Sequence, residues 1–240
     1  MILYGRNPVR EALRGRRRGS VSDIWATSGA AREPWLAGAA VRVAGAEEIA
    51  RRCGSASHQG VCAEAGPYPY AGAGEILARK EPLVVALDQV QDPQNLGSIC
   101  RTAECVGAAG VVIPERRAAE VTAAVCKASA GAVEHLAVAR VRNMADFLAQ
   151  ATQAGCWCYG ASAEEGPAGR RPLPYDRPEY RGGGVVLVLG SEGHGLRPRV
   201  AGACDELIAL PLLGMVGSLG VSAAAAALLY EILQNRSSNP

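Results

Sequence analysis

The stretch LVVALDQVQDPQNLGSICRTAE, residues 83–104, places an uninterrupted apolar run before a segment rich in helix-start residues. The run 83–88 has the length and composition of a strand that is buried on both faces. The segment after it carries Asp, Pro, Asn and Gly, and it predicts a helix over 97–106. Arg101 lies near the start of that helix, where a cation works against the helix dipole. We therefore expect Arg101 to serve something other than helix stability.

The same alternation of apolar strand and helix continues toward the end of the chain. Further strands are predicted at residues 110–113, 137–141, 156–162, 185–190 and 206–212, and a last helix is predicted over 218–234. Strands that are apolar on both faces and alternate with helices predict an α/β domain with a mostly parallel sheet, covered on both sides. Ligands of such sheets bind at the carboxyl ends of the strands.

The first third of the chain reads as a smaller α/β unit. Strand-like segments at 21–27, 41–44 and 58–65 alternate with short helical segments. The following stretch GPYPYAGAG is rich in proline and glycine, which is typical of a domain boundary. We expect a domain over residues 1–66, a linker over 67–80 and a larger domain over 81–240.

Composition and charge indicate a soluble globular chain whose first third is basic. Of 240 residues, 49% are hydrophobic and 20% are charged, and the net charge is +2. Residues 1–80 hold 12 Lys and Arg against 7 Asp and Glu. The densest basic piece is RGRRRG at 14–19, and such a patch usually binds phosphate groups. The alternative for so short a run is a solvated loop.

The eight cysteines indicate neither a disulfide framework nor a zinc site. The chain has no CxxC pair, and its three histidines lie far apart, so a metal site is not expected. Cys156 and Cys158 are expected on one face of a buried strand. No signal peptide or membrane-spanning apolar segment is found, which predicts a cytoplasmic protein with reduced thiols.

Three glycine-containing polar loops follow predicted strands. They are DPQNLGSICRTAE, GSEGHGLRP and LPLLGMVGSLGVS. Neither the dinucleotide fingerprint GxGxxG nor the phosphate loop GxxxxGK[ST] follows any strand, so conventional NAD and ATP sites are disfavoured. Three such loops at one edge of a sheet predict a single shared pocket.

These loops resemble the three motifs of the SpoU (TrmH-like) branch of the SPOUT RNA 2′-O-ribose methyltransferases. DQVQDPQNLGSICRTA, VVLVLGSEGHGL and LPLLGMVGSLGVSAAAAALLYEI match the motifs in order. YGRNPVREAL and HQGVCAEA are similar to parts of the ribosomal-protein-like α/β RNA-binding domain that is fused to the RlmB type of this family. The resemblance implies a C-terminal trefoil knot, which patterning alone would not predict.

The resemblance also implies the cofactor and the partners. The cofactor would be S-adenosylmethionine, contacted by Gly190, Leu210 and Leu219, while Gly193 and Gly214 leave room for it. The alternative for these residues is plain packing at strand ends. A homodimer is implied, with the knot helices packed against the partner subunit.

The catalytic residues implied by the resemblance are Arg101, Asn95, Glu192 and Ser218. Because guanidinium is effectively always protonated, Arg101 is expected to hold a phosphate and stabilise the developing alkoxide, with the proton removed by Glu192 or water. Simpler alternatives exist for the others. Asp92 and Asn95 would cap one helix, Ser218 would cap the last helix, and Glu192 would pair with Arg197.

One position departs from the family pattern. Gly220 stands where the family usually has the asparagine of S-L-N-V-S, and the loss of that amide weakens the catalytic assignment. A water in the space left is an alternative.

The expected substrate is a guanosine of large-subunit (23S) ribosomal RNA, bound in part by Arg16, Arg17 and Arg18. The alternatives are a tRNA or other rRNA 2′-O-methyltransferase, including the kind that confers antibiotic resistance, and a catalytically impaired RNA-binding or ribosome-assembly factor. A small-molecule dehydrogenase is a third class, but it lacks its phosphate fingerprint.

Overall fold

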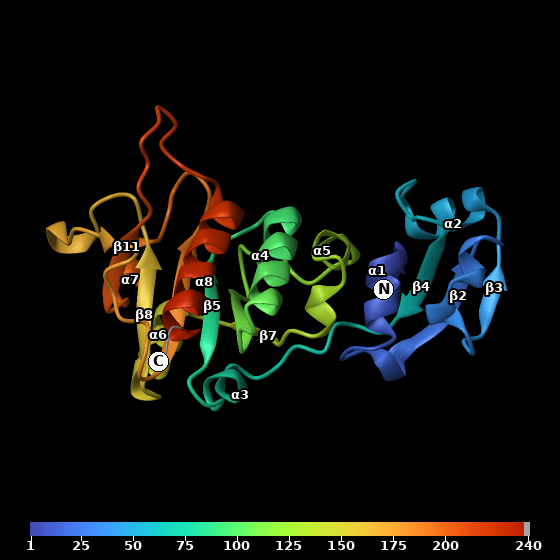
Figure 1. Cartoon of the computed structure of the whole chain (residues 1–240), viewed down its shortest axis with the longest axis horizontal. Coiled ribbons are helices and arrows are strands. Elements are labelled where there is room, and N and C mark those ends of the chain that lie inside the picture. Colours follow the sequence, from blue (N-terminus) through green and yellow to red (C-terminus); the bar gives the residue numbers. More distant parts are fainter. Residues whose placement is uncertain (238–240) are drawn as a thin grey trace.

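The computed structural model of the chain describes residues 1–237, which form two sheets with their helices (Figure 1). The N-terminal sheet has the order β1-β4-β2-β3. Strand β4 pairs antiparallel with both β1 and β2, and β3 pairs parallel with β2. Its elements are β1 (Ile2–Tyr4), α1 (Arg6–Ala12), β2 (Val21–Ala26), β3 (Val41–Val43), α2 (Ala46–Cys53) and β4 (Val61–Ala65).

The second sheet has seven strands in the order β7-β6-β5-β10-β8-β11-β9, and its neighbouring strands all pair in parallel. The strands are β5 (Leu83–Asp88), β6 (Gly110–Pro114), β7 (Val138–Val141), β8 (Cys156–Ala161), β9 (Leu173–Pro174), β10 (Gly184–Gly190) and β11 (Glu206–Ala209). The helices are α3 (Ala73–Leu77), α4 (Pro93–Cys105), α5 (Ala123–Ala128), α6 (Met144–Gln153), α7 (Pro198–Gly202) and α8 (Val221–Ser237).

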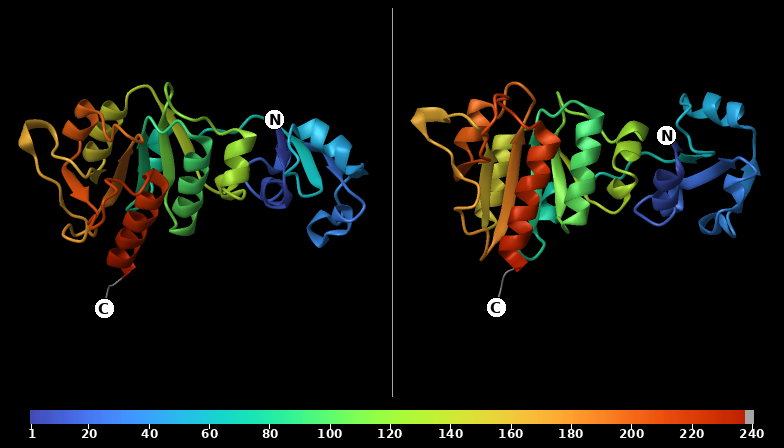
Figure 2. Two further views of the ribbon diagram at one scale, coloured as in Figure 1. Left: turned by 90° about the horizontal axis from the view of Figure 1, so that it is seen from above. Right: turned by 45° about the horizontal axis from the view of Figure 1, so that its top comes forward.

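The central strands are buried on both faces, as their continuous apolar sequences predict. In β5, Val85 and Leu87 pack into the core cluster that also contains residues of α4, α5 and α8. The alternate residues Val84 and Ala86 pack into a second cluster with residues of α3, α6 and α7. Helices therefore cover both faces of the sheet, which Figure 2 shows from two further directions.

The structure confirms the predicted α/β class and the mostly parallel sheet, with differences at particular elements. The predictions omitted β1 and the two-residue edge strand β9. The last helix begins at Val221 rather than Ser218, because Gly220 before it has φ +75°, a left-handed conformation that does not continue a helix. The predicted knot stays a prediction.

The eight cysteines are free thiols, and six of them are buried. Cys156 and Cys158 face the core from β8, as expected, while Trp157 between them is exposed. Burial raises the pKa of the Cys158 thiol to about 12, so this side chain stays protonated and serves as core. Among residues 1–237, no helix is both long and apolar enough to cross a membrane.

Arg17 joins the N-terminal part to the second sheet's helices. Its side chain is 1% exposed, and its Nε donates to Glu134 Oε2 at 3.0 Å while an Nη makes a second bond to the same carboxylate. Tyr68 lies against the guanidinium, 5.7 Å from ring centroid to Cζ. The prediction that Arg17 contacts RNA is therefore corrected, because the side chain is enclosed and already paired. Arg16 and Arg18 are exposed.

Candidate functional site

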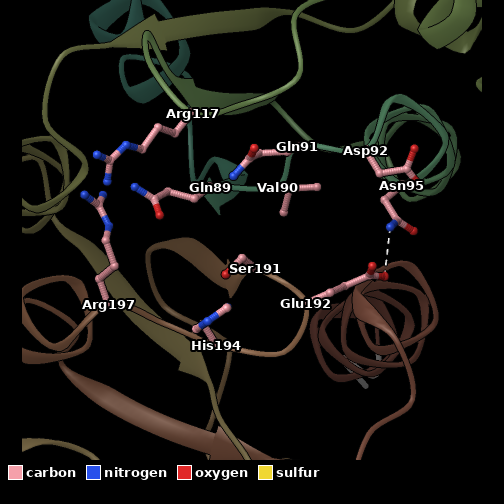
Figure 3. Close-up of a pocket in the computed structure, with 11 residues that line it drawn as sticks. Gln89, Val90, Gln91, Asp92, Asn95, Arg117, Ser191, Glu192, His194 and Arg197 are labelled. Atoms are coloured by element: carbon pink, nitrogen blue, oxygen red, sulfur yellow. Dashed lines mark hydrogen bonds between the residues drawn. The ribbon is translucent and has the colours of Figure 1, made fainter.

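The polar loops after β5 and β10 lie together at the carboxyl ends of the parallel strands and form one cleft. The cleft has a volume of about 740 Å³ (Figure 3). It is lined by Arg117 after β6, by Gln89, Val90, Gln91, Asp92 and Asn95, and by Ser191, Glu192, His194, Gly195 and Arg197. The first two predicted loops therefore converge on one cleft, as expected.

The loop after β5 contributes one helix cap and one cleft residue. Asp92 accepts a hydrogen bond from Gln94 N at 3.0 Å, so it caps α4. This agrees with the alternative that Asp92 has a capping role. Asn95 does not cap the helix. Its Nδ2 donates to Glu192 Oε1 at 2.8 Å, which joins the first loop to the second across the cleft (Figure 3).

Asp88, the first residue of the D-x-x-x-D motif, holds the second loop in place. It is fully buried at the end of β5, and its Oδ2 accepts from Arg197 N at 3.0 Å. Its Oδ1 accepts from Arg197 Nε at 2.8 Å and from Arg197 Nη2 at 2.6 Å. Arg197 therefore pairs with Asp88 and not with Glu192. The pairing of Asp88 with Arg197 was not predicted, although the position of Asp88 at the end of a buried strand was a usable signal.

The loop after β10 is a tight hairpin closed on itself. Ser191 and Gly195 exchange backbone hydrogen bonds of 3.1 and 3.0 Å. A Cβ added to Gly190 would lie 2.1 Å from the carbonyl carbon of Gly195, closer than any real contact. Only glycine fits at this position, and the hairpin presents Glu192 to the cleft.

The third loop, residues 210–220, extends beyond the carboxyl end of the sheet between β11 and α8 (Figure 1). Leu210 packs partly against the core, whereas Leu213 is 99% exposed and Leu219 is also exposed. At the end of the loop, a Cβ added to Gly220 would lie 3.9 Å from Glu192 Oε1. Gly220 thus faces the Asn95–Glu192 pair, where the family asparagine would place its amide.

The structure brings together only part of the predicted catalytic set. Asn95 and Glu192 meet in the cleft, but Arg101 and Ser218 do not line it. Arg101 lies on the exposed side of α4, about 9 Å along the helix axis from Asn95. Within residues 1–237 no carboxylate pairs with it. Ser218 is exposed in the third loop, three residues before α8 begins, so it is not the cap of that helix.

The residues predicted to hold the cofactor fit an adenosyl group in chemistry. Gly193 and Gly214 have no atoms within 4 Å of an added Cβ, which leaves backbone groups open to a ligand. Leu213 and Leu219 present apolar surface that a purine could cover. Gly214 and Leu219 are exposed in the third loop and do not line the cleft. Within the described part of the chain, no group of His, Cys, Asp and Glu side chains could hold a metal ion.

We expect Gly190→Ala to destabilise the protein by about 1–3 kcal/mol, because the new methyl group forces the hairpin away from Gly195. Thermal unfolding would measure this, and calorimetric titration with S-adenosylmethionine would report on the hairpin itself. Gly202→Ala is the matched control, since a Cβ there meets no atom within 4 Å. Equal melting temperatures for the two variants would contradict the close approach.

Comparison with known families places both halves of the chain. Residues 82–230 match the SpoU rRNA Methylase family, and residues 2–71 match the family described as RNA 2′-O ribose methyltransferase substrate binding. A Bacillus subtilis relative, named as a TrmH family tRNA/rRNA methyltransferase, is 44% identical over 75% of this chain and 71% of its own length. A Staphylococcus haemolyticus relative with the same kind of name is 36% identical over 98% of this chain and 96% of its own length.

Solved structures have the same fold. The AdoMet-bound rRNA methyltransferase of Sinorhizobium meliloti superposes with a TM-score of 0.80 at 24% identity, covering 96% of this chain and 85% of that one. At this identity the likeness concerns the fold alone. It extends across both the N-terminal part and the second sheet.

Proposed function

Because the chain belongs to the SpoU rRNA methylase family, we propose that it transfers a methyl group from S-adenosylmethionine to a ribose 2′-hydroxyl of RNA. The observation that carries the proposal is the Asn95–Glu192 pair, which joins two motif loops in a cleft at the carboxyl ends of the strands. We further propose a guanosine of large-subunit ribosomal RNA as the target. Arg16 and Arg18, both exposed on the N-terminal part, support binding of RNA phosphates.

S-adenosylmethionine, when bound, supplies an activated methyl group, so the protein has to position the ribose oxygen and assist loss of its proton. Asn95 fixes one oxygen of Glu192 at 2.8 Å. The other oxygen, Oε2, accepts no hydrogen bond from residues 1–237 and is free to receive the hydroxyl proton. Glu192 is therefore the proposed proton acceptor. We propose that Arg101 and Ser218, which do not line the cleft, act on the side from which the RNA approaches.

We also propose a homodimer acting in the cytoplasm. The third loop exposes Leu213, Met215, Val216 and Leu219 next to α8. Such a cluster of exposed apolar side chains is typical of an interaction surface. A second copy of the chain would cover it through an isologous contact.

Labelled methyl transfer to transcripts of large-subunit rRNA and of tRNA tests the activity and the substrate class. We expect label on rRNA and little on tRNA. Glu192→Gln keeps the acceptor for Asn95 but removes the base, so we expect a rate about 10²–10⁴-fold lower. Preference for tRNA would reject the proposed target, and a wild-type rate in Glu192→Gln would reject Glu192 as base.

One observation favours a second candidate, a factor that binds RNA but is catalytically impaired. Gly220 lacks the amide that would reach the Asn95–Glu192 pair, and a lost hydrogen bond in a transition state is typically worth about 1–3 kcal/mol. Asparagine tolerates the left-handed conformation of Gly220 better than most residues. If wild type binds S-adenosylmethionine without turnover and Gly220→Asn gains activity, this candidate is favoured.

A further inference from the structure

The end of the cleft away from the Asn95–Glu192 pair is cationic. Gln89, Arg117, His194 and Arg197 line it, and in Figure 3 they lie opposite Asp92, Asn95 and Glu192. None of these four side chains is required by the proton transfer proposed above. The charge of Arg117 and Arg197 and their shared cleft suggest that they bind a second part of the substrate.

Arg197 is held rigidly but keeps one side open. The carboxylate of Asp88, which is fully buried, accepts from Arg197 Nε at 2.8 Å and from Arg197 Nη2 at 2.6 Å. The Arg197 side chain is nevertheless 45% exposed, so part of its donor surface faces the cleft. A guanidinium pre-oriented by a buried carboxylate loses little side-chain freedom when it binds an anion.

Arg117 adds a second positive charge at the same end. It follows β6 in the left-handed conformation, with φ +57°, and its guanidinium points toward that of Arg197 in Figure 3. Within residues 1–237 no carboxylate forms an ion pair with Arg117, whereas Asp88 pairs with Arg197. Two neighbouring guanidinium groups with one paired carboxylate leave one positive charge to be neutralised by a ligand.

We propose that Arg117 and Arg197 bind a backbone phosphate of the RNA, next to the nucleotide whose ribose lies at Asn95 and Glu192. This assignment rests on the proposed function. A 2′-hydroxyl and its flanking phosphates belong to one short piece of chain, so a site that takes the ribose has to take a phosphate close by. The cleft volume of about 740 Å³ is within the range that holds a nucleotide-sized ligand. Planar guanidinium pairs are the side chains best suited to phosphate.

The test compares Arg117→Gln with Arg116→Gln, which removes the same charge from the exposed neighbour that does not line the cleft. The probe is an in vitro transcript of large-subunit rRNA, titrated at several salt concentrations. For Arg117→Gln we expect about 10-fold weaker binding and a salt slope smaller in magnitude by about 0.7–0.9. For Arg116→Gln we expect less than about 2-fold change.

Calorimetric titration of both variants with S-adenosylmethionine separates the RNA phosphate from the cofactor carboxylate as the bound anion. Unchanged cofactor affinity in Arg117→Gln, together with the RNA effect, supports the proposal. Weakened cofactor affinity with intact RNA binding would overturn it, and so would equal RNA affinities for the two variants. Because RNA affinity is measured without turnover, an inactive wild-type protein that still shows the Arg117 effect would reject the proposed function and leave the phosphate site standing.

Discussion

Glu134→Ala is expected to lower the free energy of unfolding by about 3–5 kcal/mol, because it leaves the Arg17 guanidinium buried without its counter-ion. Burial alone would lower the pKa of Arg17, but the hydrogen bonds and charge of Glu134, together with Cys126, raise the pKa above its usual value. The arginine therefore stays charged in the wild type and carries the full cost of desolvation when the carboxylate is removed. Urea unfolding followed by circular dichroism measures the loss.

The exposed pair Arg52–Glu48 offers the matched control for this prediction. Its two side chains are 40% and 41% exposed, and the pair spans one turn of α2. Glu48→Ala should cost no more than about 0.5 kcal/mol, since solvent screens such pairs. Replacement of both Arg17 and Glu134 by apolar residues of similar volume should recover most of the loss. Equal losses for Glu134→Ala and Glu48→Ala would contradict the buried ion pair.

Arg101→Ala is expected to lower kcat by about 10²–10³-fold, the usual effect of removing one donor that stabilises developing negative charge. Arg101 is exposed on α4 and has no carboxylate partner within residues 1–237. The substitution should therefore leave the melting temperature and the affinity for S-adenosylmethionine unchanged. Single-turnover methyl transfer to rRNA, measured at saturating cofactor, separates the chemical step from binding.

Arg79→Ala is the control for Arg101, because Arg79 is an exposed arginine that precedes β5, at the opposite edge of the sheet from the cleft. It should retain wild-type kcat. If Arg101→Ala also retained kcat, the residue would have no role in catalysis. Because α4 begins at Pro93 rather than at the predicted residue 97, Arg101 lies in the second half of the helix, where a cation does not oppose the helix dipole.

The alternation of the strands, and the convergence of two loops, could be predicted from the sequence because they follow from local patterns. The strand β5 covers the predicted residues 83–88, since a run that is apolar on both faces has few other structures open to it. The segments that carry Asn95 and Glu192 were expected to meet because parallel strands end at one edge, and the family resemblance implied that these two residues share a site. Their 2.8 Å hydrogen bond agrees with that expectation.

Long-range pairs could not be predicted. The run RGRRRG reads as a surface segment, yet Arg17 is buried against Glu134, which lies 117 residues further along the chain. Nothing local to either residue indicates the other. The pairing of Asp88 with Arg197 likewise joins residues far apart in the sequence that nothing local connects. It shows that Arg197 contacts Asp88 rather than Glu192. The start of α8 was placed at Ser218 because a left-handed glycine at 220 cannot be distinguished from a helical one by sequence alone.

If the cleft of Asn95 and Glu192 methylates a ribose, the transferred methyl group must lie on a 2′-oxygen, and its position is therefore the decisive measurement. Large-subunit rRNA transcript would be incubated with the wild-type protein and labelled S-adenosylmethionine, digested to nucleosides and analysed by mass spectrometry. We expect 2′-O-methylguanosine, with an alkali-resistant dinucleotide in the parallel hydrolysis. Label on a base, or bound cofactor with no methyl transfer to any RNA, would contradict it.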